Sequence, residues 1–227
     1  MHDTTDILGD YLAAWAGIGV ELDAVYSGFL GAPEQVDIIK QVWETYPKAL
    51  RVVDPVMADH GKVYPTYTPE LVEAMGTLAN GADILTPNLT EAALLLGEPY
   101  QAGPYTKAYI DGILHKLSQL GPKQVVLTGV YFDEKELGAA TFDMERNATE
   151  YVLTEKIPGY YHGTGDVFAS ALLSGLLNNF NLERSAEIAV RFTAESILRT
   201  FKAQTDYRFG VNFEQSIPDL LKELKLI

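Results

Sequence analysis

The chain has 227 residues, of which 17 are Lys or Arg and 31 are Asp or Glu, so its net charge at pH 7 is −14. A chain with this negative charge repels the phosphate backbone of nucleic acids, so we do not expect a nucleic acid as its partner. The absence of cysteine excludes disulfides, thiolate metal sites and a cysteine nucleophile. No apolar run can span a bilayer, and the first ten residues do not resemble a secretion signal. We therefore expect a soluble, cytoplasmic protein with no membrane partner.

The first half of the chain alternates predicted helices with short apolar segments that predict buried strands. The expected helices cover residues 3–16, 33–47 and 68–79. The expected strands cover residues 22–28, 50–56 and 82–85. The third strand leads directly into TPNLTEAALLLG, residues 86–97, whose apolar residues follow a polar turn.

The second half continues the alternation and then ends in helices. The expected elements are a helix near 106–120, a strand at 123–129, a β-hairpin at 137–153, and helices at 164–179, 182–201 and 214–225. Strand and helix in alternation predict an α/β fold, with a mostly parallel sheet and helices on both faces. No linker and no repeat interrupts the chain, so we expect one domain over residues 1–227.

Polar residues follow each predicted parallel strand. These residues are Asp54 and Asp59, then Thr86, Asn88 and Glu91, then Thr128 and Gly129, and finally the turn HGTGD at 162–166. Ligands bind at the carboxyl ends of the strands in open α/β sheets. The topology alone therefore predicts that the four groups meet at one edge of the sheet.

The HGTGD turn opens a predicted helix with two glycines. A helix N-terminus presents unpaired N–H groups, and glycine lets an anion approach them. Gly163, Thr164 and Gly165 are therefore candidates to hold phosphoryl oxygens, and Asp166 is a candidate base for a hydroxyl that attacks phosphorus. The alternative is purely structural, because aspartate is common in a first helical turn and glycines often end a strand.

The acidic residues of the earlier turns predict a magnesium site. Asn88 and Glu91 share a helix face, and Asp54 and Asp59 follow the neighbouring strand. Mg²⁺ prefers a few carboxylates together with phosphates and water. Asn88 and Glu91 can instead form a capping box without any metal, and the two roles are compatible.

Four motifs in this order resemble the pyridoxal kinase branch of the ribokinase-like family: VVDPVMADHGKVY, ADILTPNLTEAALLLG, VVLTGV and HGTGDVFASALLSGLL. The resemblance implies a ribokinase-like three-layer α/β/α sandwich. It places the general base at Asp166 and the anion hole at Gly163, Thr164 and Gly165.

The resemblance also implies roles for the remaining motif residues. Nucleotide contacts fall on Asn88, Thr128 and Gly129, and the metal and cation site falls on Asp54, Asp59, Thr86 and Glu91. The substrate-binding residues are Phe29, which falls near the substrate's pyridine ring, and Asp166. The implied cofactors are ATP and Mg²⁺, together with a monovalent cation such as K⁺. The relatives are homodimers, which makes a homodimer the expected assembly.

The implied activity is ATP-dependent phosphorylation of the primary alcohol of pyridoxal, pyridoxine or pyridoxamine. A hydroxymethylpyrimidine kinase is the first alternative, although such relatives usually carry cysteine where Asp166 stands. A non-catalytic nucleotide-binding homologue is the second alternative. Family members begin with a strand and helix that this sequence does not match, so we expect an N-terminally incomplete unit. Residues 57–67 are the expected lid.

Overall fold

The computed structural model describes residues 3–227, which divide into two compact units. The first unit contains residues 3–102 and 112–127, and the second contains residues 103–111 and 128–227. Helix α5 (Lys107–Gln119) and strand β6 (Gln124–Val130) each have residues in both units. The expectation of one domain stays a prediction.

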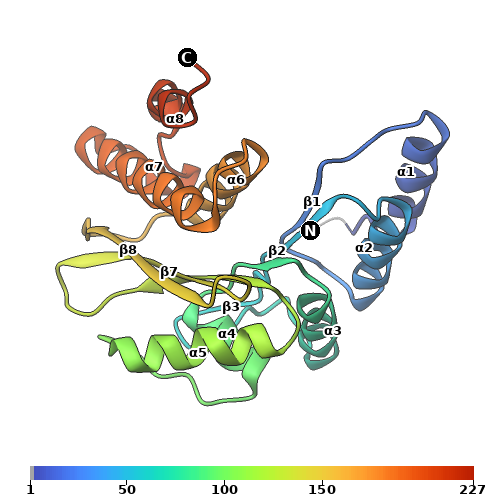
Figure 1. Ribbon diagram of the computed structural model, residues 1–227, viewed down its shortest axis with the longest axis horizontal. Coiled ribbons are helices and arrows are strands. Elements are labelled where there is room, and N and C mark those ends of the chain that lie inside the picture. The colour runs from blue at the N-terminus through green and yellow to red at the C-terminus, as the bar shows by residue number, and fades with distance from the viewer. Residues whose placement is uncertain (1–2) are drawn as a thin grey trace. The chain divides into compact units, whose positions relative to one another are not determined.

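The first unit consists of parallel strands separated by helices (Figure 1). Its helices are α1 (Thr5–Gly17), α2 (Pro33–Thr45), α3 (Pro69–Asn80) and α4 (Leu89–Leu96). Its parallel strands are β1 (Ala24–Ser27), β2 (Leu50–Val53) and β5 (Ile84–Leu85), together with the start of β6. The register pairs Ala24 with Leu50, Val52 with Ile84, and Ile84 with Gln124, always in parallel.

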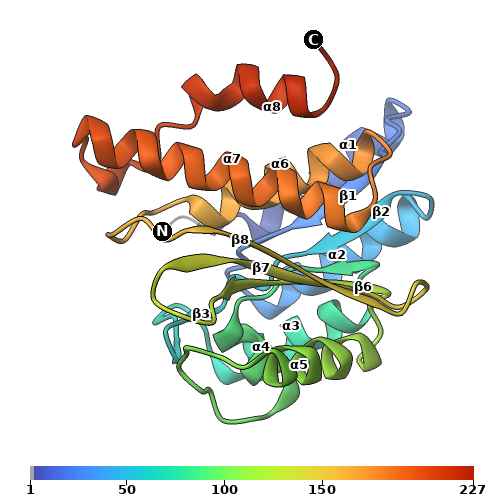
Figure 2. The ribbon, with the colours of Figure 1, turned by 60° about the vertical axis from the view of Figure 1, so that its left-hand side comes forward.

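The second unit combines a β-hairpin with helices. The hairpin is formed by β7 (Glu136–Asp143) and β8 (Ala148–Glu155), and it confirms the hairpin expected at 137–153. Helix α7 (Leu182–Ala203) packs against the hairpin and α6 (Thr164–Leu177) packs against α7, and α8 (Ile217–Glu223) follows (Figure 2). The expected helix at 214–225 begins as a 3₁₀ turn (Glu214–Ser216), and another such turn covers Tyr207–Phe209.

The strand order is β1-β2-β5-β6-β7-β8, with β6 common to the two units. Every neighbouring pair from β1 to β6 is parallel, and the β7–β8 pair is antiparallel. This confirms the expected α/β class and its mostly parallel sheet. Strand β6 buries Val125, Val126 and Leu127 completely, as expected for a strand covered on both faces.

Two features of the first unit were not expected from the sequence. Helix α1 forms as predicted and packs against α2, but none of its residues is buried, and Ile7, Tyr11 and Trp15 are exposed. Within the segment 57–67, residues Ala58–Asp59 and Lys62–Val63 form a second, two-stranded sheet, β3–β4, which the sequence did not predict. No helix among residues 3–227 is both long and apolar enough to cross a membrane.

Candidate active site

Asp54 lies directly after β2 and is held by the end of β1. Its backbone N–H donates to the carbonyl oxygen of Ser27 at 2.9 Å, which continues the parallel register by one residue. The hydroxyl of Tyr26 donates to the Asp54 Oδ2 atom at 3.0 Å. Adjacent strand ends therefore fix this carboxylate, and the sequence analysis did not identify Tyr26 as its partner.

The N-terminus of α4 has the capping box that the sequence offered as an alternative. Asn88 Oδ1 accepts from the N–H groups of Thr90 and Glu91 at 2.8 and 3.0 Å, and Glu91 Oε2 accepts from the Asn88 N–H at 2.8 Å. The second oxygen of Glu91 accepts from the Met57 N–H at 3.0 Å. Both carboxylate oxygens of Glu91 therefore have backbone donors.

Glu91 is only 2% exposed, which is unusual for a carboxylate. Burial raises the pKa of Glu91 to about 8, and the nearby negative charge of Asp54 adds to this rise. The hydrogen bonds from the backbone N–H groups of Asn88, Met57 and Ala58 lower the pKa and only partly offset the burial. Asp54 and Glu91 are thus close enough for their charges to interact.

Side chains at the same helix N-terminus form hydrogen bonds with the β3–β4 hairpin. Asn88 Nδ2 donates to the Ala58 carbonyl oxygen at 2.8 Å, and the Gly61 N–H donates to Thr90 Oγ1 at 2.9 Å. His60 and Gly61 have φ values of 48° and 76°, as a two-residue type I′ hairpin turn requires. The hairpin, which contains most of the expected lid, is therefore tied to two side chains at the start of α4.

Asp59 and Thr86, two of the expected metal ligands, lie in different environments. The Asp59 carboxylate accepts from the His60 N–H at 2.8 Å and has the His60 imidazole 3.5 Å away, within the hairpin turn. Thr86 is buried, and its hydroxyl lies 3.4 Å from the Val53 carbonyl oxygen, to which it donates. Among residues 3–227, no three His, Cys, Asp or Glu side chains come together as a metal site. The metal site stays a prediction.

The expected anion turn lies at the start of α6 in the second unit. Gly163 is the N-cap residue with φ 75° and ψ 5°, and Thr164 Oγ1 donates to the Tyr161 carbonyl oxygen at 3.3 Å. A Cβ atom on Gly163 or Gly165 would meet no atom of residues 3–227 within 4 Å, apart from adjacent residues and the helix's own backbone. Asp166 is exposed in the first helical turn. No side chain at these two glycines therefore blocks the approach of an anion to the helix start.

Thr128 and Gly129 lie in β6 rather than in a turn after it. The predicted strand ended at 129, and the observed strand continues to Val130. Gly129 is exposed and has φ 75°, a conformation that favours glycine over any other residue. These residues share the second unit with the anion turn, and their nucleotide contacts stay a prediction.

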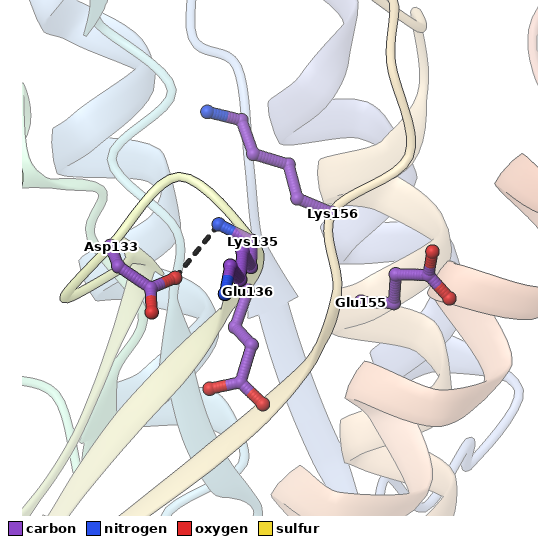
Figure 3. A pocket seen from close by; sticks show the side chains of 5 residues that line it. All are labelled: Asp133, Lys135, Glu136, Glu155 and Lys156. Atoms are coloured by element: carbon purple, nitrogen blue, oxygen red, sulfur yellow. Dashed lines mark hydrogen bonds between the residues drawn. The ribbon is translucent and has the colours of Figure 1, made fainter.

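A cavity of about 650 Å³ lies elsewhere in the second unit. It is lined by Asp133, Lys135, Glu136, Glu155 and Lys156, none of which the sequence suggested as site residues (Figure 3). The Lys156 ammonium is already paired with Glu134 at 2.7 Å. Two lysines and three carboxylates therefore line the cavity, and none of them belongs to the predicted site, so we do not place the active site there.

The comparisons with known proteins agree with the geometry. The model of the phosphomethylpyrimidine kinase family matches residues 8–210. The chain belongs to this family. It is also 32% identical to the pyridoxal kinase of Arabidopsis thaliana, over 81% of this chain and 60% of that enzyme. The aligned region thus spans less than two thirds of that relative.

Two solved structures are similar to this chain in sequence and in fold. A Bacteroides thetaiotaomicron protein crystallised with pyridoxal is 34% identical, with a TM-score of 0.90 over 96% of this chain and 78% of that chain. The Staphylococcus aureus pyridoxal kinase in complex with ADP is 26% identical, with a TM-score of 0.74 over 87% of this chain and 69% of that chain. The ribokinase-like fold expected from the motifs is therefore confirmed.

Proposed function

We propose that the protein is an ATP-dependent kinase that phosphorylates the primary alcohol of pyridoxal and related vitamers to give pyridoxal 5′-phosphate. The observation that carries the proposal is the start of α6. There, a glycine with positive φ, open space at the Cβ positions of Gly163 and Gly165, and an exposed first-turn aspartate occur together at Gly163–Asp166. The similarity to pyridoxal kinases supports the choice of substrate.

The proposed reaction uses these residues in separate roles. The N–H groups of the glycine turn hold phosphoryl oxygens and stabilise the charge that develops on them. The alcohol oxygen attacks the γ-phosphorus, the bond to the bridging oxygen breaks, and ADP leaves. The alcohol's proton passes to the Asp166 carboxylate. Thr128, Gly129 and Asn88 are proposed to contact the nucleotide, and Phe29 the pyridine ring.

The donor atoms of the first unit suit a magnesium ion that keeps water and phosphate ligands. Asp54 and Thr86 offer oxygen donors, whereas the side-chain oxygens of Asn88 and Glu91 have backbone partners. Such an ion, when bound, neutralises phosphate charge during transfer. Asp54 would be its main protein ligand, with Asp59 and Glu91 in support. A monovalent cation near Thr86, a homodimer and a cytoplasmic location belong to the same proposal.

The experiment measures ATP-dependent formation of pyridoxal 5′-phosphate by the wild-type chain and by Asp166→Asn. General base catalysis of this type is worth about 10²–10⁴ in rate, so we expect kcat to fall by that range. Glu183→Gln is the matched control, because Glu183 is also a first-turn acid, on α7, and each substitution weakens one helix-dipole contact. The control should keep its activity. Undiminished turnover by Asp166→Asn would contradict the proposed base.

The family's name makes a hydroxymethylpyrimidine kinase the second candidate. The same assay with hydroxymethylpyrimidine in place of pyridoxal distinguishes the two activities. A higher kcat/KM for hydroxymethylpyrimidine would replace the vitamin B6 assignment. ATP binding without turnover of either alcohol would identify a non-catalytic nucleotide-binding homologue.

A further inference from the structure

One buried hydroxyl joins two loops at the strand ends of the first unit. The Tyr67 hydroxyl accepts from the Leu30 N–H at 3.4 Å and donates to the Pro55 carbonyl oxygen at 3.3 Å. Leu30 belongs to the loop after β1, and Pro55 follows Asp54 after β2. Tyr67 and Leu30 are 8% and 7% exposed, so water cannot readily replace either bond.

The ring of Tyr67 also holds the aromatic residue next to Leu30. The rings of Tyr67 and Phe29 are 5.7 Å apart between centroids and inclined at 73°, an edge-to-face contact. Phe29 remains 44% exposed, so part of its surface is free to contact another ring. Tyr67 therefore fixes both the backbone beside Phe29 and one edge of the Phe29 ring.

The phenol of Tyr67 stays protonated under physiological conditions. Burial raises its pKa to about 12, and the negative charges of Glu91 and Asp54 act in the same direction. The hydrogen bond from Leu30 opposes this rise only in part. The bond that the hydroxyl donates to Pro55 is therefore present throughout the pH range of an enzyme assay.

We propose that Tyr67 is a positioning residue that orients the Phe29 ring as a platform for the aromatic ring of the alcohol substrate. This inference rests on the proposed function. Tyr67 has no role in the expected chemistry, and its two hydrogen bonds end on backbone atoms. Its loss should therefore weaken capture of the aromatic alcohol and leave ATP binding and the transfer step nearly unchanged.

The test compares Tyr67→Phe with Tyr46→Phe. Tyr46 is a matched control in the same unit, because its buried hydroxyl has no hydrogen-bond partner within residues 3–227. For Tyr67→Phe we expect KM for pyridoxal to rise about five- to thirtyfold, as the loss of two backbone-directed bonds suggests. KM for ATP and kcat should change less than about twofold. Tyr46→Phe should leave all three constants unchanged.

Phe29→Leu supplies the second variant, because it removes the platform and leaves the hydroxyl bonds of Tyr67 in place. It should raise KM for pyridoxal alone, and Tyr67→Phe should add little in the Phe29→Leu background. Equal rises in the KM values of pyridoxal and ATP, or full additivity of the two substitutions, would overturn the positioning role.

Direct binding separates this inference from the proposed function. Pyridoxal is titrated into the wild-type chain and each variant, with quenching of the protein's fluorescence as the signal. Binding without turnover would contradict the kinase, and a Kd that still rises about five- to thirtyfold in Tyr67→Phe would support the platform. No pyridoxal binding by the folded wild-type chain would overturn both.

Discussion

At the scale of single residues, two neighbouring glycines in the anion turn should behave differently. Gly163 has φ 75°, whereas Gly165 lies inside α6, and no atom of the described residues would block a Cβ at either position. We expect Gly163→Ala to lose about 1–2 kcal/mol of unfolding free energy, because the left-handed conformation disfavours a side chain. Gly165→Ala should keep or gain stability.

Urea unfolding of both variants measures these differences in unfolding free energy. The kinase assay measures the effect of each substitution on activity. If phosphate approaches the turn, Gly165→Ala should fold well and yet lose activity, since its methyl group occupies the anion's approach. A Gly165→Ala variant as active as the wild type would place the phosphate elsewhere. Equal stability losses in the two variants would contradict the role of the positive φ.

The buried carboxyl of Glu91 makes stability depend on pH. Its folded-state pKa of about 8 lies above the ordinary value of 4.5, so the folded protein binds the additional proton between these values. The unfolding free energy should therefore fall as pH rises from about 4.5 to about 8, by at most about 1.4 kcal/mol per pH unit. The expected fall applies to the metal-free protein.

Urea denaturation at several pH values measures this slope, with Glu91→Gln as the comparison. The glutamine keeps one acceptor oxygen, so the variant should be less stable overall, but its slope over the same pH range should be shallower. Parallel slopes in the two proteins would show that Glu91 is ionised in the folded state throughout this range.

The sequence predicted single residues well where the signal was local. The capping box of Asn88 and Glu91 follows from a spacing of three residues. The sequence did not predict the roles of Tyr26 and Tyr67, whose hydroxyls form hydrogen bonds with residues 28 and 37 positions away in the chain. Such contacts depend on which loops the fold brings together. Glycines at the start of a predicted helix, where unpaired N–H groups are expected, can be recognised in the sequence. The direction in which a loop tyrosine points cannot.

At the scale of elements, the long helices were predicted and the two strands of the second sheet were not. The helices at 33–45, 69–80, 107–119 and 182–203 have enough turns for an apolar period to appear. Strands β3 and β4 have two residues each, too few to show alternation, and their His-Gly turn is not a common hairpin signal. The side chains of α4 hold this hairpin, so its position depends on tertiary contacts.

Thr90→Val tests that dependence. It removes the acceptor of the Gly61 N–H and keeps the shape of a buried side chain. A typical hydrogen bond contributes about 0.5–1.5 kcal/mol, so amide exchange in residues 58–63 should become about two- to tenfold faster. Thr77→Val is the control, because Thr77 is an exposed threonine of α3 whose hydroxyl donates to Ala74. Unchanged exchange in Thr90→Val would mean that this bond does not hold the hairpin.

At the scale of the whole molecule, the net charge of −14 should make stability increase with moderate salt. Repulsion among the acidic side chains is long-ranged, and raising the ionic strength from 0.01 to 0.1 M shortens the screening length from about 30 to about 10 Å. Ion pairs oppose this trend, for example Arg184 with Glu187 and Arg199 with Glu195. Such partly exposed pairs are worth about 0–1 kcal/mol each, so relief of repulsion should dominate.

The urea midpoint of unfolding, measured at these two ionic strengths, should therefore rise. The double variant Glu44→Gln, Glu73→Gln removes two exposed negative charges from helices α2 and α3, so its midpoint should depend less on salt. A midpoint that falls with salt would mean that the ion pairs outweigh the repulsion. In the proposed kinase reaction, ATP approaches against the field of this acidic chain, so the same screening should lower KM for ATP wherever the anion turn does not compensate locally.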